Sequence, residues 1–223
     1  MCIRDRSKDA NENLINEGMN EESIKLVGNI MIDSLLNNIE KSSASKIHNK
    51  IKVEKENYAL ITLHRPSNVD YEDNLSRIVN AIEIISEDIK IVFPIHPRTA
   101  NMIEKFGLES RINQIPNLVL TKPLGYLDFL ALMKHSKVVL TDSGGLQEET
   151  TALGIPCITL RDNTERPITI EQGTNVLVGN KTEKITTEWK NIYRNGGKSG
   201  RIPELWDGKT SERITNAIVD FLK

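Results

Sequence analysis

The 223-residue chain is predicted to be an α/β protein with a mostly parallel sheet, and three observations support this fold class. From Tyr58 onward, short apolar runs rich in β-branched residues alternate with segments of helical periodicity. Polar or charged residues directly follow five of these runs. Two adjacent glycines, Gly144 and Gly145, stand where a helical pattern begins. Strands that alternate with helices form right-handed βαβ units, so the strand carboxyl ends are expected at one edge of the sheet.

The composition is that of an ordinary globular chain and excludes several classes of protein. Hydrophobic residues make up 38% of the chain, enough for a packed core, and 27% of the residues are charged. A net charge of −2 argues against a nucleic-acid partner. Cys2 and Cys157 are too few and too far apart for a disulfide framework or a zinc cluster, and no histidine pair has metal-ligand spacing. With no membrane-length apolar run and no signal peptide, we expect a cytoplasmic protein without a membrane partner, metal or cofactor.

The first 56 residues lack the regular strand–helix alternation of the later chain and are predicted to be distinct from the rest. Residues 1–7 do not blend with the chain after them, so we expect a leader from sequence assembly or cloning joined to a truncated reading frame. The alternative is a genuine terminus. Within residues 8–56, the pattern predicts a polar helix, a strand, a second helix and a lysine-rich linker or loop, at residues 10–18, 24–27, 30–39 and 42–56.

From residue 57 to residue 223 the alternation is regular and predicts one domain. Apolar runs predict strands at residues 58–63, 90–95, 117–121, 137–141, 156–160 and 175–178. Helical periodicity predicts helices at residues 72–86, 99–106, 126–135, 143–153, 183–193 and 209–222. The residues that follow the first five strands are His64-Arg65, His96-Pro97-Arg98, Lys122, Asp142-Ser143 and Arg161-Asp162. In an open α/β sheet those strand ends form the ligand crevice, and here they supply cations suited to a diphosphate.

The run from Val138 to Thr150 indicates an anion site. If Ser143 is the N-cap, Gly144 and Gly145 occupy the first two helical positions, where each costs roughly 0.5–1 kcal/mol relative to alanine. Free N–H groups and the positive helix end favour a phosphate close to this bare backbone. Glu149 lies one turn further on the same face, where a carboxylate suits a neutral diol such as ribose. The alternative is an ordinary strand-to-helix turn with solvated glutamates.

Several other residues have both a functional and a structural interpretation. His64 and His96 end strands, and each is either a site residue or a turn histidine bonded to backbone. Phe129 either packs in the core or offers a face to a base. The charged loop of residues 161–167 is either solvated or closes over a ligand. His48 and His135 are interpreted as structural, because one lies in the polar loop and the other ends a helix.

Six motifs together resemble the non-hydrolysing UDP-N-acetylglucosamine 2-epimerases, from about Ser7 to the end of the chain. The motifs are Thr62-Leu63-His64-Arg65-Pro66, Pro94-Ile95-His96-Pro97, Leu124-Gly125-Tyr126, Thr141-Asp142-Ser143-Gly144-Gly145-Leu146-Gln147-Glu148-Glu149, Arg161-Asp162-Asn163-Thr164-Glu165-Arg166-Pro167 and Gln172-Gly173-Thr174-Asn175. The resemblance implies one Rossmann-like lobe, with helices on both faces of its sheet, of a two-lobed B-type glycosyltransferase-like fold. Residues 57–223 would be the UDP-binding C-terminal lobe, and residues 8–56 the end of the N-terminal lobe and the linker.

The resemblance also implies roles for individual residues. Ser143, Gly144 and Gly145 would hold the diphosphate, and Glu149 the ribose hydroxyls. His64 would be catalytic, at the reaction centre. The remaining UDP-binding residues would be Arg65, His96 lining the site, Phe129 on uracil and Arg166 on phosphate.

By the same resemblance, the full-length protein is expected to be a homodimeric isomerase of cell-envelope polysaccharide biosynthesis. Its reaction eliminates UDP and adds it back to a 2-acetamidoglucal, inverting C2 of the sugar. Because the carboxylates that handle the C2 proton belong to the N-terminal lobe, this chain is expected to be inactive alone. The run after His64-Arg65 reads Pro66-Ser67-Asn68, where the family often has arginine, an acidic residue and asparagine, which puts allosteric activation by substrate in doubt.

Two other functions stay open from the sequence. A UDP-sugar glycosyltransferase lobe would have the same crevice, with an acceptor in place of the C2 base. A nucleotide-binding module without chemistry would also fit, because no catalytic triad can be argued from the residues. The sequence does not distinguish UDP-N-acetylglucosamine from a more oxidised or diacetamido UDP-sugar.

Overall fold

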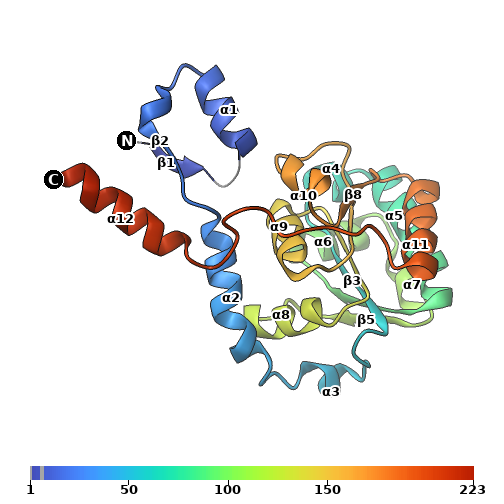
Figure 1. Ribbon diagram of the computed structural model, residues 1–223. Coiled ribbons are helices and arrows are strands. Elements are labelled where there is room, and N and C mark those ends of the chain that lie inside the picture. Colours follow the sequence, from blue (N-terminus) through green and yellow to red (C-terminus); the bar gives the residue numbers. More distant parts are fainter. Residues whose placement is uncertain (1, 6–7) are drawn as a thin grey trace.

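The computed structural model describes residues 2–5 and 8–223, so Met1, Arg6 and Ser7 of the expected leader lie outside the described residues. Residues Cys2–Asp5 form strand β1, which pairs in parallel with β2 (Ile24–Leu26). Helix α1 (Lys8–Asn16) and the short 3-10 helix η1 (Glu21–Ser23) complete this N-terminal unit. Figure 1 shows the unit standing apart from the main body of the protein.

Six parallel strands form the main sheet, in the order β5-β4-β3-β6-β7-β8. Their bounds are β3 Tyr58–Thr62, β4 Lys90–Pro94, β5 Leu118–Thr121, β6 Val138–Thr141, β7 Cys157–Thr159 and β8 Asn175–Leu177. The chain winds outward from β3 in one direction and from β6 in the other. The predicted α/β class is therefore confirmed, and the boundary between β3 and β6 is the switch point where such sheets bind ligands.

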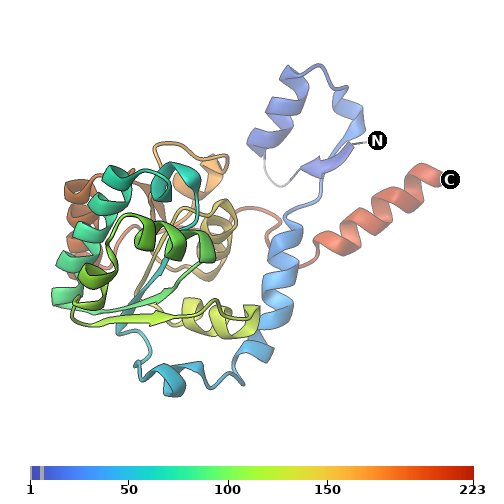
Figure 2. The same cartoon turned by 180° about the vertical axis from the view of Figure 1, so that it is seen from behind.

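Two hydrophobic layers cover the two faces of this sheet. Alternate strand residues point to opposite faces, so Ala59 and Ile61 join one layer while Tyr58 and Leu60 join the other. The first layer also contains side chains from α5 (Glu72–Asp88), α6 (Pro97–Lys105), α7 (Glu109–Asn113) and α11 (Thr182–Asn195). The second contains side chains from α2 (Ile30–Ser42), α8 (Tyr126–Lys134), α9 (Gly144–Leu153) and α10 (Pro167–Glu171). Figures 1 and 2 show the resulting three-layer arrangement.

The short α-helices α3 (Ile47–Ile51), α4 (Pro66–Val69), α7 and α10 were not predicted. Helix α3 lies in the stretch predicted as a polar linker or loop, and it forms because Ile47 buries against the second layer. Helices α4 and α10 each begin at a proline, and α6 begins at Pro97 rather than at the predicted Thr99. Proline favours the first helical position because its fixed φ suits a helix and its missing N–H is not needed there.

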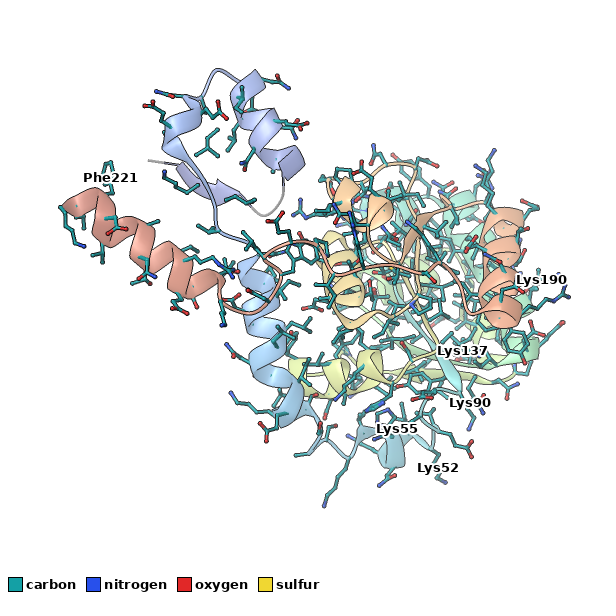
Figure 3. All side chains as sticks on the ribbon, viewed as in Figure 1. Lys52, Lys55, Lys90, Lys137, Lys190 and Phe221 are labelled. Carbon is teal, nitrogen blue, oxygen red and sulfur yellow. The ribbon has the colours of Figure 1, made fainter. Side chains whose placement is uncertain are left out.

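Helix α12 (Thr210–Leu222) projects away from the sheet (Figures 1 and 2). Asp33 of α2 holds its start, because one carboxylate oxygen accepts the Thr210 N–H at 3.0 Å and the other accepts the Ser211 N–H at 2.7 Å. Figure 3 shows Phe221 near the free end of this helix, where the ring is 64% exposed. Across the described part of the chain, no helix is long and apolar enough to cross a membrane.

Candidate functional site at the carboxyl edge of the sheet

The residues expected to line one crevice do come together. His64 follows β3, His96 follows β4, Ser143 follows β6 and Arg161 follows β7. Because all six strands run in parallel, these residues share the carboxyl edge of the sheet. The prediction of a shared edge is therefore confirmed.

The lysines of the opposite edge cannot serve this crevice. Lys90 begins β4 and Lys137 directly precedes β6, so both lie at the amino ends of the strands (Figure 3). The Lys90 Nζ donates to the Lys52 carbonyl at 2.8 Å, on the same side of the molecule. The cations available at the carboxyl edge are chiefly arginines, which suit a phosphate because their planar fork donates two parallel hydrogen bonds.

Asp142 lies at the centre of the switch point, although sequence reasoning gave it no role. Its side chain is 0% exposed. Its carboxylate accepts the backbone N–H groups of His64 at 3.0 Å and Arg65 at 2.8 Å, and the Asn68 amide at 3.3 Å. Burial alone would raise the pKa of Asp142, but the hydrogen bonds from the His64 side chain and these backbone groups outweigh it and lower that pKa. An ionised carboxylate therefore joins the ends of β3 and β6.

The two crevice histidines lie close together. Nδ1 of His64 is 2.9 Å from Oδ1 of Asp142, and the His64 side chain is 40% exposed. The His96 ring centre is 5.6 Å from that of His64. His96 also has a local structural role, because its Nδ1 accepts the Arg98 N–H at 3.2 Å and so caps α6. The structure thus places both histidines at the crevice and supports the structural alternative for one nitrogen of His96.

The start of α9 has the form expected of an anion site. Ser143 is the N-cap, yet within the described residues its side chain makes no capping hydrogen bond. A Cβ added at Gly144 would meet only Glu165 Oε2, at 3.8 Å, and one at Gly145 would meet only Ser143 Oγ, at 4.0 Å. Neither glycine has a positive φ. Neither packing nor backbone geometry within the described chain therefore requires glycine here, and the bare backbone leaves room for a ligand at the helix start.

Two arginines beside α9 are paired with carboxylates. Nε of Arg166 is 2.9 Å from Oε1 of Glu148, whose side chain is buried. The Arg161 guanidinium donates to both carboxylate oxygens of Glu165, at 2.8 and 2.9 Å. The hydrogen bonds from Arg161 lower the pKa of Glu165 to about 2. Sequence reasoning missed Glu148, because no local pattern separates it from its neighbour Glu149.

Glu149 is buried one turn into α9, with 5% of its surface exposed. Its Oε1 accepts the Tyr126 hydroxyl hydrogen at 3.1 Å. Burial raises the pKa of Glu149 to about 7, and the neighbouring charge of Glu148 adds to this effect against the hydrogen bond from Tyr126. The structure thus provides a buried carboxyl group with spare acceptor capacity, as a ribose site requires, and contradicts the alternative of a solvated glutamate.

The loop of residues 161–167 is anchored to the domain. Thr164 Oγ1 donates to Gln147 Oε1 at 2.6 Å, and Asn175 Nδ2 donates to the same oxygen at 3.2 Å. Thr164 Oγ1 also accepts the Arg166 N–H at 3.0 Å. This network fixes the backbone that carries Arg166, and sequence reasoning missed it because its members lie far apart in the chain.

Phe129 and the two remaining histidines have structural surroundings. Phe129 is partly buried against the second hydrophobic layer, which agrees with the core interpretation, and its packing on uracil stays a prediction. His48 Nε2 lies 3.0 Å from the Tyr58 hydroxyl, and the His48 and His135 rings are 5.6 Å apart. Burial lowers the pKa of both histidines. Among residues 10–223, whose side chains the structure describes, no group of three or more His, Cys, Asp or Glu is placed to hold a metal ion.

Comparison with known proteins gives consistent matches. The family model described as UDP-N-acetylglucosamine 2-epimerase matches residues 6–219. A UDP-N-acetylglucosamine 2-epimerase of Methanocaldococcus jannaschii is 42% identical over 211 residues, which cover 88% of this chain and 58% of the relative. A UDP-2,3-diacetamido-2,3-dideoxy-D-glucuronate 2-epimerase of Pseudomonas aeruginosa is 35% identical over 208 residues, with 86% and 56% covered. The chain thus spans a little over half the length of these curated relatives.

A solved structure matches equally well. The crystal structure of Methanocaldococcus jannaschii UDP-GlcNAc 2-epimerase in complex with UDP-GlcNAc and UDP superposes with a TM-score of 0.87 and 38% identity. The match covers 96% of this chain and 59% of that one. The Rossmann-like sheet of this chain is therefore the same fold as one part of that longer protein.

Proposed function

The chain belongs to the UDP-N-acetylglucosamine 2-epimerase family, and from this premise we propose that it is the UDP-binding lobe of such an epimerase. The whole enzyme interconverts UDP-N-acetylglucosamine and UDP-N-acetylmannosamine, by eliminating UDP and adding it back to a 2-acetamidoglucal. The observation that carries the proposal is the start of α9. There, two glycines that the chain itself does not require lie at the switch point of the sheet, beside two arginines.

The diphosphate occupies the space over Ser143, Gly144 and Gly145. The N–H groups at the start of α9 point toward it, and the helix dipole favours its negative charge. Arg166 and Arg65 supply the neutralising charge. Arg166 can keep its contact with Glu148 through Nε and its Nη1 hydrogen bond to the Glu165 carbonyl, while its other N–H groups donate to phosphate, because a guanidinium carries five donors.

The nucleoside lies further along α9. Glu149 accepts hydrogen bonds from the ribose hydroxyls, Phe129 packs on uracil and His96 lines the site. A carboxyl group that is 5% exposed and bonded within the described chain to a phenol hydroxyl has acceptor capacity left for a diol.

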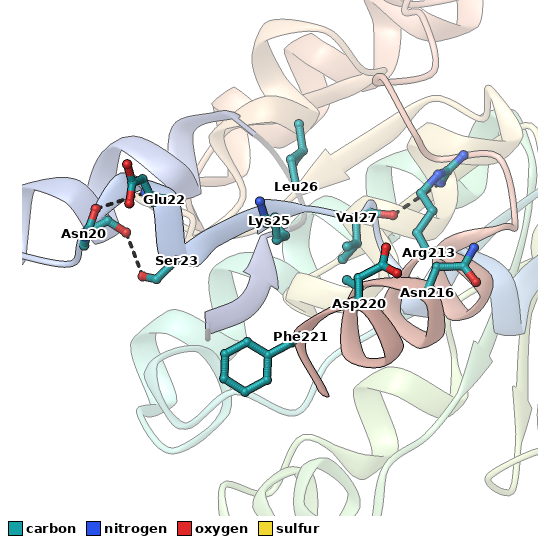
Figure 4. Close-up of a pocket in the computed structure, with 11 residues that line it drawn as sticks. Asn20, Glu22, Ser23, Lys25, Leu26, Val27, Arg213, Asn216, Asp220 and Phe221 are labelled. Carbon is teal, nitrogen blue, oxygen red and sulfur yellow. Dashed lines mark hydrogen bonds between the residues drawn. The ribbon is translucent and has the colours of Figure 1, made fainter. Parts of the chain in front are cut away.

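His64 lies at the reaction centre, and a further lobe completes the site. Residues 57–223 form the UDP-binding domain, and residues 8–56 form the linker and the edge of a second lobe. Away from the crevice, a hollow of about 750 Å³ lies between Lys25–Val27 and the Arg213–Phe221 part of α12 (Figure 4). We also infer that the whole protein is a homodimer, as the resemblance implied.

The family match over residues 6–219 favours the epimerase over the glycosyltransferase lobe and the plain nucleotide-binding module. The two relatives carry different UDP-sugars in their names, so the sugar specificity of this chain needs its own measurement. UDP-N-acetylglucosamine and a diacetamido UDP-sugar should be compared in the same titration. If the diacetamido sugar binds more tightly, the proposed function stands with that sugar as the substrate.

Binding is tested by titration calorimetry with UDP and with uridine, on the unaltered chain and on Arg166→Ala. We expect Arg166→Ala to weaken UDP by roughly 1.5–3 kcal/mol, because a charged hydrogen-bond partner is lost. Uridine, which has no phosphate, should be affected much less. Arg77→Ala is the matched control, because Arg77 is an exposed arginine on α5, which packs on the other face of the sheet from α9. Equal losses of UDP and uridine in Arg166→Ala would remove the phosphate assignment, and no UDP binding at all would remove the proposed function.

A further inference from the structure

Asp142 makes more contacts to the catalytic histidine than support of the backbone would need. Its Oδ1 is 2.9 Å from Nδ1 of His64 and 3.2 Å from the backbone nitrogen of the same residue. Its Oδ2 accepts the N–H groups of His64 and Arg65 and the side-chain amide of Asn68. Every one of these partners is a hydrogen-bond donor or can become one.

The accepting character of Asp142 fixes the proton on His64. An ionised carboxylate has no hydrogen to donate, so the nitrogen that faces Oδ1 at 2.9 Å must carry the proton. The other ring nitrogen, Nε2, has no hydrogen-bond partner within residues 10–223, the part of the chain whose side chains are described. The ring is partly exposed at the crevice, whereas Asp142 is wholly buried beneath it.

We infer that Asp142 is the positioning residue of this site, which holds His64 with its proton on Nδ1 and thereby presents Nε2 as the proton-exchanging nitrogen. Any contribution of Asp142 to epimerisation rests on the proposed function. The assignment of the His64 tautomer rests on the contacts of the described residues alone. When Nε2 takes up one proton, the neutral ring becomes an imidazolium and the adjacent carboxylate compensates its charge. When Nε2 gives the proton back, the same Nδ1–H tautomer is restored, so Asp142 itself stays ionised throughout.

The isosteric variant Asp142→Asn separates this role from mere support. An asparagine keeps the size of the side chain but turns one acceptor oxygen into an NH₂ donor. Oδ2 faces three donors, so the carbonyl oxygen of the asparagine belongs there and the NH₂ falls at the position of Oδ1. There it would donate to Nδ1, which then has to be the unprotonated nitrogen, and the proton moves to Nε2.

The test is the ¹⁵N spectrum of the imidazole rings, recorded on the unaltered 223-residue chain at a pH where His64 is neutral. Single His→Gln variants assign the signals. We expect His64 to show the Nδ1–H pattern in the unaltered chain and the Nε2–H pattern in Asp142→Asn. Asn68→Ala is the matched control, because it removes a contact to the same carboxylate without touching His64 and should keep the Nδ1–H pattern.

The outcomes are distinguishable from those of the proposed function. An Nε2–H pattern in the unaltered chain overturns the inference, even if Asp142→Asn fails to fold. The same tautomer change in Asn68→Ala as in Asp142→Asn also overturns it, because the effect would then be general loss of support. Absence of UDP binding with an Nδ1–H pattern in place would count against the proposed function and leave the positioning role of Asp142 intact.

Discussion

At the scale of single residues, Glu149 is the group whose chemistry depends most on its surroundings. Its ordinary pKa of 4.5 is raised to about 7, first by burial and then by the charge of Glu148. Below about pH 7 the folded protein therefore favours the protonated form of Glu149. Hydroxyl groups that donate to this carboxyl favour its charged form instead, so a bound ribose and a proton compete for Glu149.

The raised pKa of Glu149 predicts a pH-dependent effect of Glu149→Gln on stability. Below pH 4.5 the carboxyl group is protonated in both the folded and the unfolded chain, and the substitution should change little. As pH rises through 4.5 to about 7, the unfolded chain ionises first and the unaltered protein loses stability. The gap between pKa values of 4.5 and about 7 corresponds to about 3 kcal/mol, so Glu149→Gln should be more stable by that order at pH 8.

Denaturant unfolding at pH 4.5 and at pH 8 measures this effect. Glu165→Gln is a control of opposite sign, because the pKa of Glu165 is lowered to about 2. Its ionised form stabilises the fold above pH 4.5, and this contribution is lost as pH falls through 2. A Glu149→Gln protein with the same change in unfolding free energy at both pH values would contradict the buried, protonated state of Glu149.

At the scale of elements, α9 combines a weak helix start with a well-packed remainder. Gly144 and Gly145 open the helix, whereas all six residues from Gln147 to Ala152 are buried. Tertiary packing of the later turns therefore holds the helix in place and tolerates two poor helix formers at its exposed start. This arrangement keeps backbone N–H groups accessible at the crevice without loss of the fold.

We predict that Gly145→Ala stabilises the protein and weakens UDP binding. The new Cβ has room, with Ser143 Oγ at 4.0 Å, and alanine should raise the unfolding free energy by roughly 0.5–1 kcal/mol. The same methyl group occupies space over the helix start, where the diphosphate would approach. Thermal unfolding with and without UDP measures both effects in one preparation.

Gly154→Ala is the matched control for Gly145→Ala. Gly154 ends the same helix with a φ of 70°, a left-handed conformation that costs other residues roughly 1–2 kcal/mol. Gly154→Ala should therefore destabilise the protein and leave UDP binding unchanged. Unaltered UDP affinity in Gly145→Ala would show that the bare backbone at this position serves no ligand.

At the scale of the whole molecule, the sheet domain and the surrounding elements differ in how fully they are packed. The domain from β3 to α11 has two buried hydrophobic layers, whereas α12 exposes Ile218, Val219, Phe221 and Leu222. The strands β1 and β2 form a two-stranded sheet, which is marginal by itself. The crevice on the domain supplies groups for UDP, but the proposed reaction also needs a base for the C2 proton and a closed site.

We therefore predict that this chain binds UDP without epimerising a UDP-sugar. UDP should raise the melting temperature, with a stabilisation of about 2.7 kcal/mol when its concentration is 100 times its dissociation constant. General acid–base groups contribute about 10²–10⁴-fold to such reactions, and their absence should leave no measurable exchange of the C2 hydrogen in deuterated water. Appreciable exchange would mean that the residues of this chain supply the base, and the two-lobe assignment would be wrong.

The sequence by itself determined the order along the chain of the six main-sheet strands and of the longer helices, the shared edge of His64, His96, Ser143 and Arg161, and the unusual start of α9. These features are local, because periodicity of two or 3.6 residues and a glycine pair at an N-cap can be read within one short segment. The short helices α3, α4, α7 and α10 could not be predicted in this way. One or two buried contacts or a proline at the first position decide them, and such signals are weak in isolation.

Only the tertiary structure decided which residues act together at the site. The hydroxyls of Thr62 and Thr141, 79 residues apart, meet at 2.7 Å because β3 and β6 are neighbours, and the same pairing brings Asp142 to His64. The contact of Arg166 with Glu148 likewise joins a loop to a helix. Strand order and long-range ion pairs depend on how distant segments pack against one another. No periodicity or motif within a single segment carries that information.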